Sequence, residues 1–159
     1  MLKRVLAFIL CCLMIVSLSA CGNDEPKTKK YAITNSLGTQ IDVSLLVGLG
    51  TKVKTDGDSI SISTRAGDVK GKALTFEDIN SYRVDHYNDM DFFEYTINGF
   101  DCFGYGGEGD GATAFTHVIV VSDNAGVILV ASSQDAMYDA EATVTFSVEG
   151  AVASTESES

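Results

Sequence analysis

The stretch Phe92–Ser132, FFEYTINGFDCFGYGGEGDGATAFTHVIVVSDNAGVILVAS, decides the fold. Asn98-Gly99 separates two strand-like segments, and Asn-Gly is the strongest two-residue signal for a type I′ β-hairpin. Thr116–Val121 and Val127–Ala131 are almost continuously apolar, which is typical of central strands covered on both faces. A short polar turn separates these two strands, so the whole stretch predicts an antiparallel sheet assembled from local hairpins.

The flanking segments extend this sheet. Residues 31–64 alternate apolar and polar side chains in the way of half-buried strands. Within them, Asp56-Gly57 predicts a second hairpin of type I′, in which both central residues have positive φ. Residues 143–149 alternate again and predict a last strand.

Two segments between the strands predict helices. In Thr75–Tyr87, Thr75 and Asp78 have the spacing of a capping box, and Asp78 suits the positive end of a helix dipole. The Ala-rich segment Asp135–Ala142 predicts a short C-terminal helix. The expected fold is therefore α+β: an antiparallel β-sheet with one main helix (about 75–87) and a short C-terminal helix packed on it, in a single domain of residues 31–150.

This order of elements resembles a known fold. The order is similar to that of the PsbP-like fold: N-terminal strands, one helix, the Ile97-Asn98-Gly99-Phe100 hairpin, two long apolar strands around a glycine turn, and a C-terminal helix and strand. Small bacterial lipoproteins share this resemblance. It implies an interaction domain that does not act as an enzyme.

The first 22 residues, MLKRVLAFILCCLMIVSLSACG, have the order of an export signal: a basic head, an apolar run too short to span a membrane, and small residues. Leu18-Ser19-Ala20-Cys21 resembles the lipobox of bacterial lipoproteins. The resemblance implies that residues 1–20 are a signal peptide and that Cys21 becomes an acylated N-terminus carrying diacylglycerol and palmitate. It also implies a protein anchored to the cell membrane and facing outside the cytoplasm.

Charge is distributed unevenly along the chain. Without Lys3 and Arg4, 9 basic residues face 22 acidic ones, and residues 84–159 hold 14 acidic residues and no Lys or Arg. This balance excludes nucleic acid as a partner, because phosphate binding needs the opposite sign. We expect residues 21–30 to be the lipidated Cys and a tether, and residues 151–159 to be a disordered acidic tail. The tether is lysine-rich, which favours an anionic bilayer, whereas the acidic remainder predicts a domain held off that surface.

The glycine-rich segment Gly104–Gly111 contains G-x-G-x-x-G after a strand. A dinucleotide site would need a helix to open there, and instead a further strand follows. We therefore expect a mobile connecting loop, in which Tyr105, Glu108 and Asp110 are the candidate recognition side chains.

Four carboxylates, Asp85, Asp89, Asp91 and Glu94, follow the main helix closely. Hard oxygen ligands of this kind can hold Ca²⁺, although the order of an EF-hand loop is not met. A solvated acidic loop and a calcium site therefore both remain open.

His86, His117 and Cys102 are the nitrogen and sulfur candidates for chemistry outside the signal segment. Their spacing matches no transition-metal motif, and no serine lies in a nucleophile elbow. His117 alternates with apolar residues on one strand face, and Cys102 has no partner thiol in the mature domain, so we expect both to be buried. No catalytic residue and no cofactor are expected; a hydrolase that relies on His86 or His117 is the weakest hypothesis.

The sequence therefore favours a membrane-anchored, extracytoplasmic lipoprotein that acts as a non-catalytic interaction module. Its acidic half predicts a protein partner with a basic face. The alternative is a lipoprotein that binds a cation or small solute through the acidic cluster 85–94.

Overall fold

The computed structural model describes residues 27–48, 50–109 and 112–148, so the signal segment, Cys21 and the acidic tail lie outside the described residues. These residues form mostly antiparallel strands with two helices, and the fold is richer in strand than the expected α+β description. The elements in chain order are β1 (Lys27–Thr34), β2 (Gln40–Val47), β3 (Lys52–Asp56), β4 (Ser59–Ser63), β5 (Asp68–Thr75), α2 (Phe76–His86), β6 (Phe93–Ile97), β7 (Phe100–Gly109), β8 (Ala112–Ser122), β9 (Ala125–Ala131), α3 (Gln134–Thr143) and β10 (Val144–Val148).

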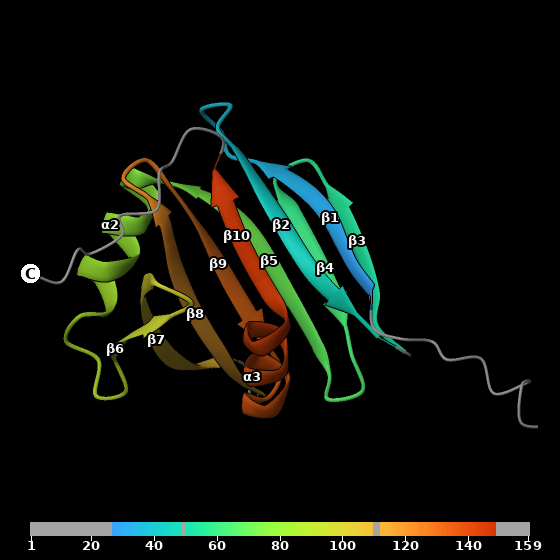
Figure 1. Cartoon of the computed structure of the whole chain (residues 1–159). Coiled ribbons are helices and arrows are strands. Elements are labelled where there is room, and N and C mark those ends of the chain that lie inside the picture. The colour runs from blue at the N-terminus through green and yellow to red at the C-terminus, as the bar shows by residue number, and fades with distance from the viewer. Residues whose placement is uncertain (1–26, 49, 110–111, 149–159) are drawn as a thin grey trace, which may run out of the picture.

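The strands form two sheets, not the single sheet that the sequence predicted (Figure 1). The larger sheet has the order β3-β4-β5-β9-β8-β7-β6, and the smaller has the order β1-β2-β10. The second sheet exists because β10 pairs with β2, about a hundred residues away, instead of with its chain neighbour β9. Each sheet buries one apolar face against the other, which is the arrangement of a β-sandwich.

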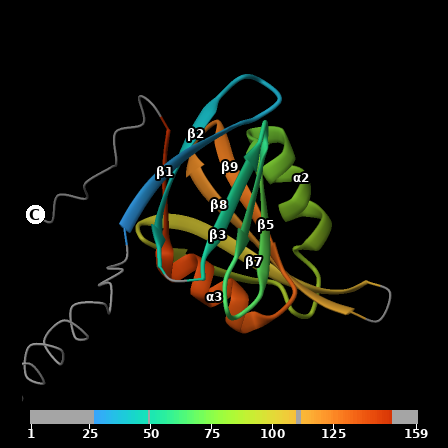
Figure 2. The same ribbon diagram turned by 90° about the vertical axis from the view of Figure 1, so that its right-hand side faces the viewer.

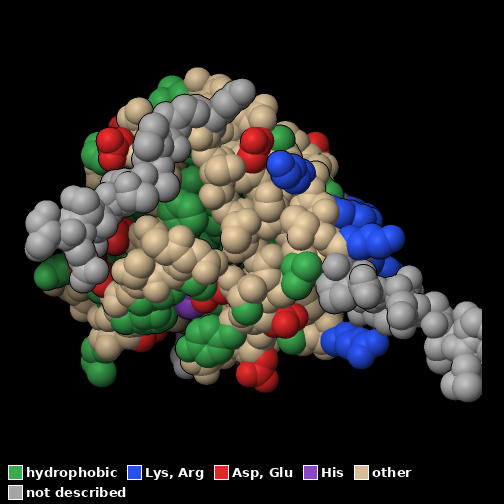
Figure 3. Space-filling model, in the orientation of Figure 1, with side chains coloured by type: hydrophobic (Ala, Val, Ile, Leu, Met, Phe, Trp, Pro, Cys, Tyr) green, Lys and Arg blue, Asp and Glu red, His purple; other side chains and the backbone are tan. Residues whose placement is uncertain are grey.

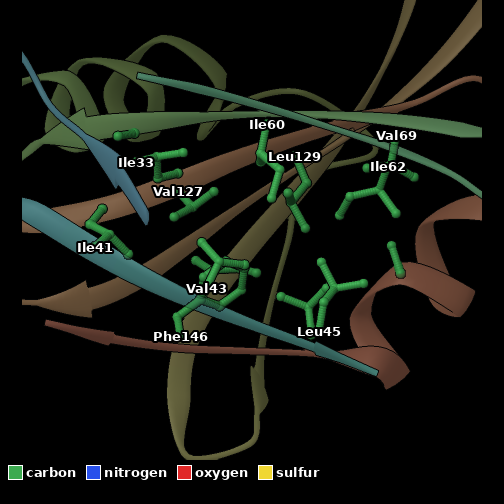
Figure 4. Close-up of a cluster of buried hydrophobic side chains, with 14 of the residues drawn as sticks. Ile33, Ile41, Val43, Leu45, Ile60, Ile62, Val69, Val127, Leu129 and Phe146 are labelled. Carbon is green, nitrogen blue, oxygen red and sulfur yellow. The ribbon is translucent and has the colours of Figure 1, made fainter. Parts of the chain in front are cut away.

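The main core lies between the two sheets (Figure 4). Alternate residues of β2, Ile41, Val43 and Leu45, are fully buried there, as period-two side-chain alternation requires. Leu129 of β9 and Phe146 of β10 meet them from the other strands. The helix α3 adds Ala136, Met137 and Ala140 to this core and so covers the part of the larger sheet that the smaller sheet leaves open.

The outer face of the larger sheet carries α2 and a second, smaller core. Ile79 is the buried residue of α2, and it packs with Leu74, Phe103, Val118 and Ile128. The central strands β8 and β9 are therefore covered on both faces, as their continuous apolar character predicted.

The predicted start of α2 is confirmed. The Asp78 N–H donates to the Thr75 hydroxyl (3.2 Å) and the Thr75 N–H donates to the Asp78 carboxylate (2.9 Å), which completes a capping box. The short C-terminal helix is also present as α3, with Ser133 as its N-cap.

One of the two predicted hairpin turns has the predicted type. Asn98 and Gly99 both have positive φ, 51° and 83°, as a type I′ turn requires. In the other hairpin, Asp56 pairs with Ser59, so the central residues are Gly57 and Asp58. Only Gly57 has positive φ there, which is the pattern of a type II′ turn, so the predicted type I′ turn is wrong.

The glycine-rich segment is not a connecting loop. β7 continues through it to Gly109 and stays paired with β8 as far as Ala112, and Figure 2 shows this hairpin as an arm that extends beyond the body. Gly104 belongs to the core: a Cβ there would lie 2.4 Å from the Phe93 ring and 2.8 Å from the His117 ring. The glycine is required for close side-chain packing, which a composition-based loop prediction overlooks.

The first strand begins earlier than the predicted tether allowed. Lys27–Lys30 pair with residues 44–47 of β2, so the stretch between Cys21 and the domain is shorter than residues 21–30. Within the described part of the chain, no helix is long and apolar enough to span a membrane.

Candidate functional site

A buried polar cluster lies on the inner face of the larger sheet and joins three elements. It consists of Tyr95 on β6, His117 on β8 and Glu141 on α3. Gly104 of β7 stands between Phe93 and His117 in the strand register. Because Gly104 has no side chain, the rings of Phe93 and His117 meet edge to face across it, with centroids 5.3 Å apart.

The three polar groups satisfy one another. The Tyr95 hydroxyl donates to Glu141 Oε1 at 2.5 Å, and His117 Nδ1 lies 2.6 Å from the same oxygen and 2.7 Å from the Tyr95 oxygen. His117 and Glu141 are only 4% and 5% exposed. A carboxylate is costly to bury unless it is hydrogen-bonded, so this cluster holds α3 to the sheet in a closed arrangement.

Burial keeps the Tyr95 phenol and the nearby Cys102 thiol protonated. Burial, followed by the hydrogen bond to Glu141, raises the pKa of Tyr95 far above its usual range. Burial likewise raises the pKa of the Cys102 thiol to about 12. The expected burial of Cys102 and His117 is confirmed. At neutral pH the thiol is therefore a weak nucleophile, since the thiolate is the reactive form.

Sequence reasoning placed His117 in the core but missed Tyr95 and Glu141 as its partners. Glu141 follows Ala140 and stands four residues after Met137, on the buried side of a short helix. An acidic residue among the buried positions of a helix was the sequence signal that could have identified Glu141. The pairing itself joins residues 24 and 46 positions apart, which no local pattern can reveal.

The acidic segment 85–94 does not gather its carboxylates. The Asp89 carboxylate lies 2.7 Å from His86 Nδ1, Asp91 accepts from the Gly106 N–H at 2.8 Å, and Glu94 lies 3.7 Å from Arg83. Among the described residues, no group of three or more His, Cys, Asp and Glu side chains could hold a metal ion. Three of the four predicted calcium ligands therefore each have a different partner, and these contacts fasten the segment to its surroundings.

Tyr105 is not an exposed recognition residue. Its ring stacks on His86 with centroids 3.7 Å apart and planes 10° apart, and burial raises its pKa to about 12. It joins the small core under α2. Glu108 belongs to strand β7, and Asp110 lies outside the described residues. The predicted binding loop is therefore a paired strand whose aromatic residue anchors α2.

An exposed apolar surface remains on the other side of α2. Phe76, Val84 and Tyr87 lie on one side of the helix at helical spacing, and Met90 follows in the next turn. Val84, Tyr87 and Met90 are 74%, 63% and 104% exposed. We call Phe76, Val84, Tyr87 and Met90 the α2 face.

Carboxylates surround the α2 face. Glu77, Asp85 and Asp89 are exposed and are direct chain neighbours of its apolar residues. In Figure 3 the α2 side shows hydrophobic and acidic side chains, whereas the Lys and Arg side chains in view lie at the opposite side. The arrangement, an apolar centre with a charged rim, is one that protein interfaces use.

No family model, curated protein or solved structure matches this chain. The likeness to the PsbP-like fold and to bacterial lipoproteins therefore stays a prediction from the sequence.

Proposed function

We propose that this protein is a membrane-anchored, extracytoplasmic lipoprotein that binds another protein through the α2 face and does not catalyse a reaction. The observation that carries the proposal is the exposed apolar surface of Val84, Tyr87 and Met90 inside a rim of carboxylates. Large side chains exposed together at one place on a small domain are typical of interaction sites.

The rim indicates the kind of partner. Asp85 and Asp89 would face a basic surface favourably and would speed encounter with it. A second copy of the chain would present the same carboxylates and would be repelled. The proposed occupant is therefore a different protein with a basic, partly apolar face.

The buried cluster supports a structural role over catalysis. A catalytic group must reach a substrate atom, and His117 and Glu141 are almost completely enclosed and bonded to each other. The other histidine, His86, is stacked on Tyr105 and bonded to Asp89. Both histidines thus have structural partners.

The anchor rests on the sequence Leu18-Ser19-Ala20-Cys21 after an apolar run. Metabolic labelling with a palmitate analogue should mark the unaltered protein and leave Cys21→Ser unmarked. Equal labelling of the two proteins would refute the anchor.

Site-specific photo-crosslinking tests the binding face. A benzophenone amino acid at Tyr87 should give a discrete crosslinked protein in intact cells. The same group at Ser61, which is exposed on β4 at a distance from α2, serves as the control. Crosslinks that are equal at both positions, or absent at Tyr87, would contradict the proposal.

Variants then measure the contribution of the face with the purified partner. Truncation of Tyr87 and Met90 to Ala should weaken binding at least about tenfold, because interface anchors of this kind dominate affinity. Asp85→Lys should mainly slow association and reduce its salt dependence. An unchanged midpoint of thermal unfolding would show that both effects arise at the surface.

The calcium alternative has its own test. A ligand that binds only the folded state raises the midpoint of thermal unfolding. Since Asp89, Asp91 and Glu94 have separate partners, we expect millimolar calcium to leave the midpoint unchanged. A clear rise that disappears in Asp85→Asn would support the cation-binding function instead.

A further inference from the structure

We propose that the end of the sandwich at which β1 begins docks directly on an anionic lipid bilayer. This basic end is formed by Lys27, Lys29 and Lys30 of β1, Lys52 of β3 and Arg65 of the β4–β5 connection. All five side chains are exposed. The inference rests on the proposed anchor at Cys21 but is independent of the proposed partner.

The tertiary structure brings these residues together from separate segments. Lys27 pairs with Val47 at the end of β2, and β3 starts five residues later at Lys52. Lys52 pairs with Ser63 at the end of β4, and the Arg65 side chain reaches back toward Gly50, where a Cβ would lie 3.6 Å from it. In Figure 3 the Lys and Arg side chains in view gather on the side where Figure 1 places β1 and β3.

The two halves of the described chain carry net charges of opposite sign. Residues 27–75 contain 8 basic and 4 acidic residues, whereas residues 76–148 contain 1 basic and 13 acidic residues. The larger sheet separates most of these groups in space, because β3 forms one edge and β7 and β6 form the other. Asp135 and Asp139 of α3 are the exception, since the Ser133 hydroxyl that caps α3 donates to the Ala66 carbonyl beside Arg65. A negative bilayer surface would attract the first end and repel the second, so it would orient the domain.

Chain length keeps the start of β1 close to the proposed anchor. Cys21 and Lys27 are six residues apart, and an extended chain advances at most about 3.6 Å per residue. The start of β1 therefore lies within about 22 Å of the acylated cysteine, whatever path the chain takes. A nine-residue tether could hold the domain off the surface, as the sequence suggested, but a strand that begins at Lys27 keeps the lysines of β1 close to the anchor.

An exposed leucine supports a lipid surface as the occupant. Leu46 pairs with Thr28 beside the lysines and is 43% exposed. Side chains alternate along a strand, so Leu46 shares a face with Thr28 and Lys30, while Lys27 and Lys29 lie on the other face. An exposed apolar side chain beside a lysine suits the boundary between headgroups and acyl chains, as in interfacial membrane-binding segments. A soluble polyanion would use the charges but would leave Leu46 without a partner.

Depth-dependent fluorescence quenching tests the docking. The acylated mature protein, with a dye on Leu46→Cys, is reconstituted in vesicles that carry a headgroup quencher. The vesicles contain either phosphatidylcholine alone or phosphatidylcholine with phosphatidylglycerol. We expect stronger quenching with phosphatidylglycerol, reversed by high salt, since the Debye length falls to about 3 Å at 1 M salt. A dye on Asn80→Cys of α2 should show no such difference.

A matched pair of charge variants sharpens the result. Lys27→Gln, Lys30→Gln and Lys52→Gln together remove three positive charges from the basic end. Each lysine should change the ratio of docked to undocked domains about fivefold, so this variant should lose most of the quenching. The control variant adds three negative charges at exposed positions away from that end, Ser81→Glu, Asn88→Glu and Asn124→Glu, and should remain docked.

The failures of the two proposals are distinguishable. The mass of the mature protein reports acylation before reconstitution, so an unacylated Cys21 refutes the anchor. An acylated protein that is quenched equally in both vesicle types, or not at all, refutes the docking alone. Loss of quenching in the control variant as well would show that net charge, and not the basic end, determines the orientation.

Discussion

The two faces of the seven-stranded sheet are covered very differently. The inner face lies under a second sheet and α3, and its polar residues Tyr95, His117 and Glu141 are bonded to one another. Within the described residues, the outer face carries α2 and the connection that follows it, from which Phe92 packs on the smaller core, and elsewhere it presents lysines and serines of β3, β4 and β5 to solvent.

This difference separates stability from recognition. Most of the buried apolar surface lies between the sheets, and buried apolar surface is the main stabilising contribution in a small domain. Changes on the outer face can therefore alter charge and binding without unfolding the protein. Both proposed surfaces, the α2 face and the basic end, consist of exposed residues outside the inner core.

The largest expected contrast comes from neighbouring residues on β9. Leu129 is fully buried in the inner core, and Val130 points outward and is partly exposed. Leu129→Ala should lower the free energy of unfolding by about 2–5 kcal/mol, whereas Val130→Ala should cost well under half of that. Urea denaturation measures both. Similar losses would mean that the two faces contribute equally, which would break the comparison.

The second-largest loss in the free energy of unfolding should come from the buried cluster of Tyr95, His117 and Glu141. Glu141→Ala leaves the Tyr95 hydroxyl and His117 Nδ1 without their common acceptor, which should cost about 2–4 kcal/mol. Glu141→Gln keeps an acceptor and should cost less. Asp139→Ala, on the exposed side of α3, is the control and should be nearly neutral in the same denaturation experiment. A neutral Glu141→Ala would show that α3 is held by its apolar contacts alone.

Alkaline pH should destabilise the folded domain. The pKa of Tyr95 is raised in the folded protein above its unfolded value near 10, so folding favours the neutral phenol. Its contribution is complete below about pH 10 and decreases as the pH rises above that value. Cys102 and Tyr105, with pKa values raised to about 12, act in the same direction. Thermal midpoints measured from pH 8 to 11 should fall less steeply in Tyr95→Phe than in the unaltered protein.

The smallest expected effect concerns the cap of α2. Thr75→Ala removes the acceptor of the Asp78 N–H and should cost about 1 kcal/mol. The loss should be local, because α2 is attached through the smaller core, so amide exchange should accelerate in α2 before the inter-sheet strands. Asn80→Ala, at an exposed position of the same helix, should leave exchange slow. Uniform acceleration across both cores would mean that α2 unfolds only with the whole domain.

Features encoded within a few residues could be predicted from the sequence. The turn at Asn98-Gly99 requires two positive φ values, and few residue pairs other than Asn-Gly adopt them readily. Thr75 and Asp78 cap α2 through hydrogen bonds that span only three residues. The apolar runs of β8 and β9 predicted coverage on both faces before the covering elements were known.

The candidate sites depended on contacts between distant residues. In the acidic segment, proximity in sequence suggested one calcium site, but Asp89 and Glu94 pair with separate residues of α2, and Asp91 pairs with Gly106 of β7. The glycines of β7 suggested a loop because composition does not distinguish flexibility from close packing, and only the position of Phe93 beside Gly104 shows which applies.

By itself, the sequence determined both helices, most of the strands, the turn at Asn98-Gly99 and the separation of charge along the chain, since each depends on neighbouring residues or on composition. The strand β5 and the glycine-rich end of β7 were not predicted. Tertiary structure alone decided that β10 pairs with β2 and that Glu141 meets Tyr95 and His117. It also decided that cations from β1 and β3 share one end of the molecule. These arrangements depend on which apolar faces cover each other, and that choice is made by the packing of the whole chain.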